Sequence, residues 1–282
     1  MEQDLATVVN STMALYDRAE RSPRIACTRC KRPAVCLDLP WIDLAICDDC
    51  WTKIEKQEQD QSEFALYSER RKNSGLPAGF WKAKFSDYKS LDGPYKLEHQ
   101  KVVRKVWDSI PHPPSPIHST KGITLLGPPG TGKTHLLACL ANRLFHTTPV
   151  KWLDLQQLQF ELGRSVFSKG EEPVEPLGKR LARDYSVVII DDFSFDSKPY
   201  DWLTNQLRGF FNDLVAQGAE LRLYLSTNNT LSGKVPTDPV TQKPTRDMDG
   251  PSLLDIFGKA TISRLVQLTT PTPYPGPDRR LG

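Results

Sequence analysis

The stretch GITLLGPPGTGKTHLLACLANRLF, residues 122–145, decides the fold class. It opens with an apolar run of strand length, continues into the pattern Gly-x-x-x-x-Gly-Lys-Thr at residues 127–134, and ends with apolar side chains at helical spacing. A strand that feeds a glycine-rich loop and then a helix N-terminus directs several backbone N–H groups at one point, which suits a bound phosphate. The stretch therefore predicts a nucleotide-binding P-loop.

Each residue type in this loop has a chemical reason. The glycines permit backbone conformations that a side chain would block. Lys133 is expected to reach the β and γ phosphates, and Thr134 to supply a hydroxyl to magnesium. The loop therefore predicts binding of ATP with Mg²⁺. The expected nucleotide contacts are Gly127, Pro128, Pro129, Gly130, Thr131, Gly132, Lys133, Thr134 and His135.

Strand-like and helix-like stretches alternate after the P-loop. Apolar runs predict strands at residues 150–155, 186–192 and 221–229, and helical spacing predicts helices at residues 156–167 and 199–217. The alternation predicts a doubly wound α/β fold, in which a parallel sheet carries helices on both faces and binds ligands at the carboxyl ends of its strands.

Two of these strands end in polar residues that fit a nucleotide site. Asp191 and Asp192 would repel each other unless a cation or solvent received them. We expect Asp191 to bind magnesium through coordinated water, from the strand adjacent to the P-loop strand, and Asp192 to polarise the attacking water. Asn228 is expected to point its amide at the γ-phosphate, and Asn229 is the neighbouring alternative.

The cysteines predict a second metal. The pairs Cys27-x-x-Cys30 and Cys47-x-x-Cys50 are separated by sixteen residues, which is the spacing of a zinc ribbon. Four thiolates would close a tetrahedral structural Zn²⁺ site. Cys36 is left over and could replace one of the four. Two disulfides are the alternative, which a cytosolic location disfavours.

Composition limits the remaining classes. The chain has 282 residues and a formal net charge of +3, which is too small to indicate nucleic-acid binding by itself. No run of 18 or more apolar residues predicts a transmembrane helix, so no membrane partner is expected. The N-terminus MEQDLATVVN lacks the regions of a signal peptide, and we expect a cytoplasmic location.

The chain is expected to divide into four segments. Proline-rich composition predicts loops or disordered chain at residues 232–252 and 270–282. The predicted segments are an N-terminal helix plus the zinc module at residues 1–52, a charged linker at 53–74, the ATPase core at 75–268 and a proline-rich tail at 269–282.

Four stretches carry a resemblance to a known family. They are NSGLPAGFWKAKFSDY at residues 73–88, the P-loop stretch at 121–144, VVIIDDF at 187–193 and STNN at 226–229. Together they resemble the bacterial replicative helicase loaders of the DnaC and DnaI type, which are AAA+ ATPases related to the IstB transposition ATPases. The resemblance covers about residues 73–268. Phe193 and Ser194 depart from it, because the family usually has an aliphatic residue and glycine there.

The resemblance implies an AAA+ core with a small N-terminal zinc-ribbon-like domain. It also implies ATP hydrolysis, a ring helicase bound through the N-terminal module, and single-stranded DNA as a second partner. Arg264 matches an arginine finger that reaches a neighbouring subunit's γ-phosphate, so self-association through the ATP site is expected. Arg279 and Arg280 are candidates for the sensor-2 arginine. The implied catalytic residues are Lys133, Asp191, Asp192, Asn228 and Arg264.

Two other functions stay open. An IstB-like transposition helper would bind duplex DNA, and an adaptor would bind ATP with little hydrolysis. Asp192 keeps the adaptor open, because most AAA+ proteins have glutamate at this position. The basic residues considered for contact with the DNA backbone are Arg164, Lys169, Lys179, Arg180 and Arg183.

Overall fold

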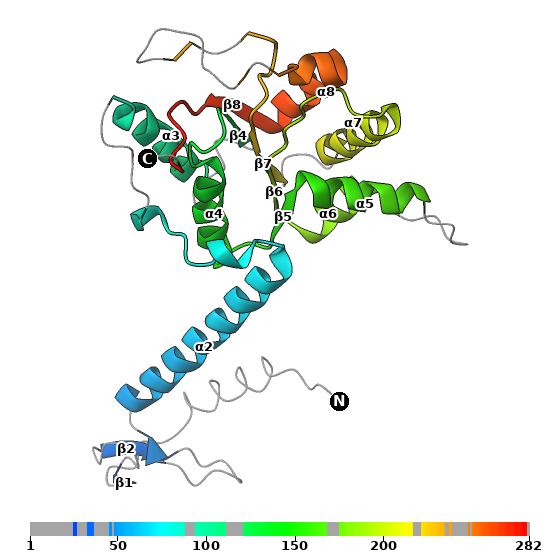
Figure 1. Cartoon of the computed structure of the whole chain (residues 1–282). Helices are drawn as coiled ribbons and strands as arrows, with labels where there is room; N and C mark the ends of the chain where they lie inside the picture. The colour runs from blue at the N-terminus through cyan, green and yellow to red at the C-terminus, as the bar shows by residue number, and fades with distance from the viewer. Residues whose placement is uncertain are drawn as a thin grey trace. The chain divides into compact units, whose positions relative to one another are not determined.

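The chain forms two compact units in the computed structural model, Met1–Leu66 and Tyr67–Gly282. The structure describes residues 25–26, 33–36, 45–46, 48–87, 94–110, 121–167, 175–216, 221–234, 237–238, 248 and 250–280. The helix expected near the N-terminus, at residues 4–21, lies outside this range. Figure 1 shows the elements along the chain.

The first unit contains a small antiparallel sheet. Its strands are β1 (Ile25–Ala26), β2 (Pro33–Cys36) and β3 (Ala45–Ile46), in the order β1-β2-β3. The helix α2 (Asp48–Ser74) follows, and it includes the residues predicted as a charged linker. Cys27, Cys30 and Cys47 lie outside the described residues, and only the backbone of Cys50 is described, in α2.

The second unit is built on a five-stranded parallel sheet in the order β5-β6-β7-β4-β8. The order corrects one expectation, because Asp191 at the end of β6 is not on the strand next to the P-loop strand β4. The strand β7 lies between them and carries Asn228 just past its end. The strands are β4 (Gly122–Leu126), β5 (Val150–Asp154), β6 (Val187–Asp191), β7 (Arg222–Thr227) and β8 (Thr269–Pro273).

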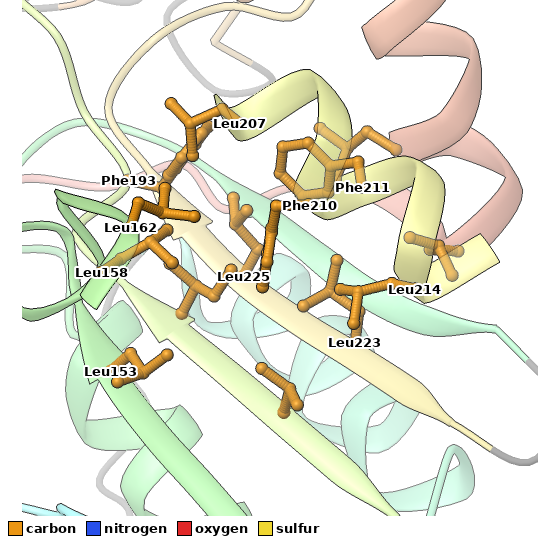
Figure 2. Close-up of a cluster of buried hydrophobic side chains, with 14 of the residues drawn as sticks. Leu153, Leu158, Leu162, Phe193, Leu207, Phe210, Phe211, Leu214, Leu223 and Leu225 are labelled. Atoms are coloured by element: carbon orange, nitrogen blue, oxygen red, sulfur yellow. The ribbon is translucent and has the colours of Figure 1, made fainter. Parts of the chain in front are cut away.

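Helices cover both faces of this sheet, as the alternation in the sequence predicts (Figure 1). Successive side chains of a strand point to opposite faces, and β6 shows this directly. Val187 and Ile189 pack with α3 and α4, whereas Val188 and Ile190 pack with the helices of the other face. Figure 2 shows part of the cluster on that other face, including Leu223, Leu225 and Phe211. The helices are α3 (Lys96–Asp108) and α4 (Lys133–Leu144) on one face, and α5 (Leu155–Phe167), α6 (Leu177–Asp184), α7 (Asp201–Ala216) and α8 (Leu253–Leu268) on the other.

The strand β8 corrects the expectation that residues 270–282 form a loop or disordered tail. It pairs with β4 in parallel, with Thr270 beside Ile123 and Thr272 beside Leu125. Proline lacks an N–H and is confined to edge strands, and β8 is at the edge of the sheet. Pro271 and Pro273 are two residues apart, so both present their missing donor to the open side.

Three short helices complete the described core. The 3₁₀ helices η1 (Ala78–Phe80) and η2 (Phe85–Asp87) precede α3. The third short helix is α6, which the sequence analysis did not predict.

Gly258 interrupts α8 with a left-handed φ of 74°, so the helix has a kink there. Within the described part of the chain, no helix combines the length and apolar character needed to span a bilayer.

Candidate nucleotide site

The P-loop lies between the end of β4 and the start of α4. Gly130 and Gly132 have φ values of 73° and 101°, in the left-handed region that favours glycine. The first intrahelical hydrogen bond of α4 joins Leu136 N to Gly132 O, so the first turn of the helix presents its N–H groups and its dipole to the pocket. These features fit the phosphate groups of a nucleotide.

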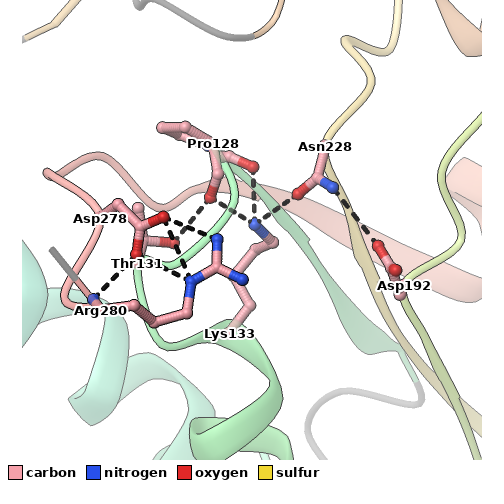
Figure 3. A network of polar contacts seen from close by, with 8 residues as sticks. Pro128, Thr131, Lys133, Asp192, Asn228, Asp278 and Arg280 are labelled. Atoms are coloured by element: carbon pink, nitrogen blue, oxygen red, sulfur yellow. Dashed lines mark hydrogen bonds and ion pairs between the residues drawn. The ribbon is translucent and has the colours of Figure 1, made fainter. Parts of the chain in front are cut away.

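Lys133 is buried at the centre of the site, with 7% of its surface exposed. Its ammonium donates to Gly127 O at 2.6 Å, to Pro128 O at 2.7 Å and to Asn228 Oδ1 at 2.8 Å (Figure 3). Burial lowers the pKa of Lys133 to about 8, although Asp192 and Asp191 act in the opposite direction. A bound phosphate would replace the carbonyl partners with a stronger, charged acceptor.

Asp191 ends β6 and lies against the first turn of α4. Its Oδ1 accepts from Ser226 Oγ at 2.6 Å and from Thr134 Oγ1 at 3.1 Å. Burial raises the pKa of Asp191, although both hydrogen bonds lower it. A hydroxyl and a carboxylate this close are the hard oxygen donors that Mg²⁺ prefers, and water and phosphate would supply its other ligands. The pair therefore fits a magnesium ion.

Asp192 is exposed and turns the chain sharply, with a φ of 51° that is uncommon outside glycine. Its N–H donates to Ser226 Oγ at 2.9 Å. The next side chain, Phe193, is fully buried and packs against Phe195 and Phe257. This aromatic anchor holds the turn, so the Asp192 carboxylate stays at the end of the sheet.

The structure separates the roles of Asn228 and Asn229. The Asn228 amide lies between Lys133 and Asp192, and its Nδ2 donates to Asp192 Oδ1 at 3.3 Å. The side chain of Asn229 is buried and bonds backbone atoms: its Oδ1 accepts from Phe195 N at 2.7 Å, and its Nδ2 donates to Phe195 O at 2.8 Å and Pro251 O at 3.0 Å. Asn228 therefore lines the pocket, whereas Asn229 connects the loop after β6 to the residues before α8.

Ser194 contributes a contact that the sequence analysis did not predict. Its Oγ accepts from Asn228 N at 2.8 Å, which ties the turn after β6 to the end of β7. A glycine at this position, as in the family pattern, has no side chain for this bond.

The C-terminal residues also reach the pocket. Arg279 N donates to Gly130 O at 2.9 Å, and Arg280 forms an ion pair with Asp278 at 2.6 Å. The sequence analysis considered both arginines only as sensor-2 candidates, because it treated this segment as a loose tail. The prolines of β8 hid the signal that could have found them, which is a fifth parallel strand ending at the ligand-binding edge.

These groups surround one pocket of about 660 Å³, a volume within the range of small-molecule sites. Phe80 and His135 lie together in the lining, with ring centroids 6.5 Å apart. The lining residues are Phe80, Pro129, Gly130, Gly132, Lys133, Thr134, His135, Asp191, Asp192, Ser226, Asn228, Arg279 and Arg280.

Arg264 does not line this pocket. Arg264 is exposed on α8, with bonds of 3.3 Å to Asn212 Oδ1 and to Gln267 Oε1. Among the described residues, no three histidine, cysteine, aspartate or glutamate side chains gather in a way that could hold a metal. The zinc site predicted from the cysteines involves residues outside the described range and stays a prediction.

The basic residues considered for DNA contact are largely paired with acids. Arg180 bonds Glu161 at 2.7 Å, and Arg183 bonds Glu175 at 2.6 Å. Arg164 lies 3.7 Å from Glu161, and Lys169 lies outside the described residues.

Comparisons with known proteins support the fold. A search of protein-family models and of curated proteins finds no significant match. The crystal structure of the DnaC helicase loader is similar, with a TM-score of 0.50 and 16% identity over 70% of this chain and 99% of that chain. DnaI has a TM-score of 0.46 and 17% identity, covering 73% and 95% of the two chains. A primosome component from Streptococcus pyogenes has a TM-score of 0.49 and 18% identity, covering 77% and 98%.

The DnaC comparison shows a shared fold. The all-parallel sheet, with helices on both faces, confirms the expected doubly wound α/β fold.

Proposed function

We propose that this chain is an ATP-hydrolysing helicase loader of the DnaC and DnaI type. The observation that carries the proposal is the convergence of Lys133, Thr134, Asp191, Asp192 and Asn228 on one pocket at the carboxyl edge of the sheet. The fold shared with the DnaC helicase loader adds support for the loader role.

In this proposal, each side chain has a separate task on the nucleotide. Lys133 leaves its carbonyl partners and contacts the β and γ phosphates. Thr134 and Asp191 hold Mg²⁺, which neutralises phosphate charge when it is bound. Asp192 and Asn228 orient the attacking water, and the 3.3 Å bond between them fixes their relative position. Arg264 is exposed and therefore accessible to a neighbouring subunit's nucleotide, as a finger residue must be.

Single-stranded DNA would bind mainly by stacking. Three aromatic side chains are exposed on elements that follow the carboxyl ends of β5 and β6: Phe160 by 65%, Tyr200 by 80% and Trp202 by 38%. Bases stack on such side chains without sequence preference. The ion pairs of Arg180 and Arg183 favour this mode over a purely basic groove.

The N-terminal module is proposed to bind zinc and the ring helicase. The strands β1 and β3 both run antiparallel to β2, so they are parallel to each other and end at the same edge of their sheet. Cys27 directly follows β1 in the sequence and Cys47 directly follows β3. In the sequence, each cysteine pair therefore begins directly after one of these two strands, which supports one shared metal.

A capture experiment tests the loader role. Full-length protein and a chain lacking residues 1–66 would serve as baits in extract of the native host with ATP and Mg²⁺. The proposal predicts that a ring helicase is captured by the full chain alone, while both baits bind ATP equally. Capture of a transposase instead of a helicase would favour the IstB-like alternative. Zinc analysis of the full chain, with one ion expected, tests the module separately.

A further inference from the structure

The C-terminal segment, residues 274–280, is packed against the outside of the P-loop. Tyr274 continues the pairing of β8, because its N–H donates to Leu126 O at 2.6 Å, and its side chain is fully buried. Five residues later, Arg279 N donates to Gly130 O at 2.9 Å. The segment is therefore attached to the last residue of β4 at one end and to the P-loop near the other.

The P-loop glycines face this segment closely. A Cβ atom on Gly127 would lie 2.1 Å from Tyr274 O, and one on Gly130 would lie 1.8 Å from Asp278 Oδ1. A Cβ on Gly132 would lie 3.4 Å from the Arg279 guanidinium carbon. Two of the three positions thus leave no room for a side chain while the segment is docked.

His99, on α3, contacts the C-terminal segment through its imidazole ring. It is fully buried, and its ring stacks on that of Tyr274 at 4.5 Å between centroids. Its Nε2 meets the carbonyl oxygen of Pro275, and its Nδ1 lies 2.7 Å from the Arg279 guanidinium. A carbonyl only accepts and a guanidinium only donates. The ring is therefore neutral, with its hydrogen on Nε2 and an acceptor lone pair on Nδ1.

From this geometry we infer that His99 is a positioning residue of the nucleotide site. In its neutral Nε2–H tautomer it holds the C-terminal segment on the P-loop and aims Arg279 into the pocket, where Arg279 contacts the terminal phosphates. The phosphate contact rests on the proposed function, whereas the docking of the segment does not. None of the P-loop, aspartate or asparagine contacts in the site includes His99.

Protonation of His99 would undo this arrangement. A second ring hydrogen would sit on Nδ1, facing the Arg279 cation, so an accepted hydrogen bond becomes a repulsion. The other described titratable rings close to His99 are the phenols of Tyr95 and Tyr274. The Tyr95 hydroxyl is hydrogen-bonded to the carboxylate of Asp238.

The pH dependence follows from the pKa of His99. Burial lowers this pKa, with the Arg279 charge acting in the same direction. The docked segment therefore favours the neutral ring. Docking is complete above the ordinary histidine pKa of about 6.5 and weakens as the pH falls below it, by up to about tenfold per pH unit.

Amide exchange of the nucleotide-free full-length protein tests the docking. Protection of the Arg279 amide, relative to the Leu125 amide within β4, is expected to fall about tenfold per pH unit below pH 6.5. Nitrogen-15 NMR of the His99 ring should show the Nε2–H tautomer at pH 7.5. In His99→Asn, the amide oxygen can replace Nδ1 as an acceptor without titrating, so protection should persist and become independent of pH. His99→Leu should lose it at every pH.

Binding of a fluorescent ATP analogue at pH 7.5 tests the phosphate contact. His99→Leu and Arg279→Ala should each weaken binding about tenfold. The double variant should bind no more weakly than either single variant, and His99→Asn should lose less affinity than either. His146→Asn, on an exposed histidine outside the site, serves as the control. An Nδ1–H tautomer would overturn the inference. Protection of the Arg279 amide that changes neither with pH nor in His99→Leu would also overturn it. Failure of the wild type to bind the analogue, with the exchange results intact, would count against the proposed function alone.

Discussion

The ammonium of Lys133 and the amide oxygen of Asn228 are 2.8 Å apart. The same amide donates to Asp192, so Asn228 links the P-loop lysine to the acid at the end of β6. This link exists because β7 lies between β4 and β6. In the proposed function, this position lets Asn228 contact the γ-phosphate and the attacking water.

Asn228→Ala should separate hydrolysis from stability. We expect ATP hydrolysis to fall about 100-fold, the usual effect of removing one donor from a developing charge, with little change in melting temperature. Asn229→Ala is the matched comparison, since it removes three buried bonds and should cost about 2 kcal/mol of unfolding free energy. Turnover assays and thermal melts of both variants check this, and equal effects of the two substitutions would contradict the assignment.

Asp192→Asn should preserve ATP binding and abolish hydrolysis. The exposed carboxylate contacts Asn228 and makes none of the P-loop bonds, so its charge matters for polarising water more than for affinity. Phosphate release and analogue binding, measured side by side, check this. A wild-type protein that binds ATP and shows no turnover would favour the adaptor alternative.

ATP affinity should fall in alkaline solution. The pKa of Lys133 is about 8 in the free site because of burial, and bound phosphates raise it. Binding above pH 8 therefore requires proton uptake, and affinity should fall by up to about tenfold per pH unit. Below pH 8 this lysine adds no dependence. Titrations between pH 7 and 10 measure the effect, and Lys133→Arg, which keeps its charge throughout, should show no alkaline fall.

Gly130→Ala should damage the site through both its backbone and its neighbour. The φ of 73° strains an alanine, and the new Cβ would collide with the Asp278 carboxylate. We expect weaker ATP binding and loss of Arg279 amide protection.

Gly209→Ala is the control for that change, because Gly209 lies in α7 with open space around its Cβ position. This substitution should raise stability by about 0.5–1 kcal/mol and leave binding unchanged. Thermal melts and analogue titrations of the two variants would contradict the account if they gave the same result.

The central part of the fold could be predicted from sequence because its signals are local. The P-loop pattern and the apolar runs of β4, β6 and β7 each identify an element without reference to the rest of the chain. The structure also brings Lys133, Thr134, Asp191 and Asn228 into one pocket. Strand order is different, because it depends on packing between elements, and the expected adjacency of β4 and β6 was wrong.

The C-terminal segment was the main part of the fold that the sequence did not predict. Its prolines gave a loop signal that the edge position of β8 overrides. Arg279 reaches the pocket only because β8 delivers the chain to the carboxyl edge and His99 orients it there. Neither contact has a pattern in the sequence, since His99 and Arg279 are 180 residues apart.

Calorimetric titration of the full-length protein with ATP, with and without Mg²⁺, tests the central claim most directly. The account predicts one binding site per chain, weaker binding when the magnesium is removed, and loss of binding in Lys133→Ala. A wild-type protein without magnesium-dependent affinity for ATP, or a Lys133→Ala variant that binds as tightly as wild type, would contradict it.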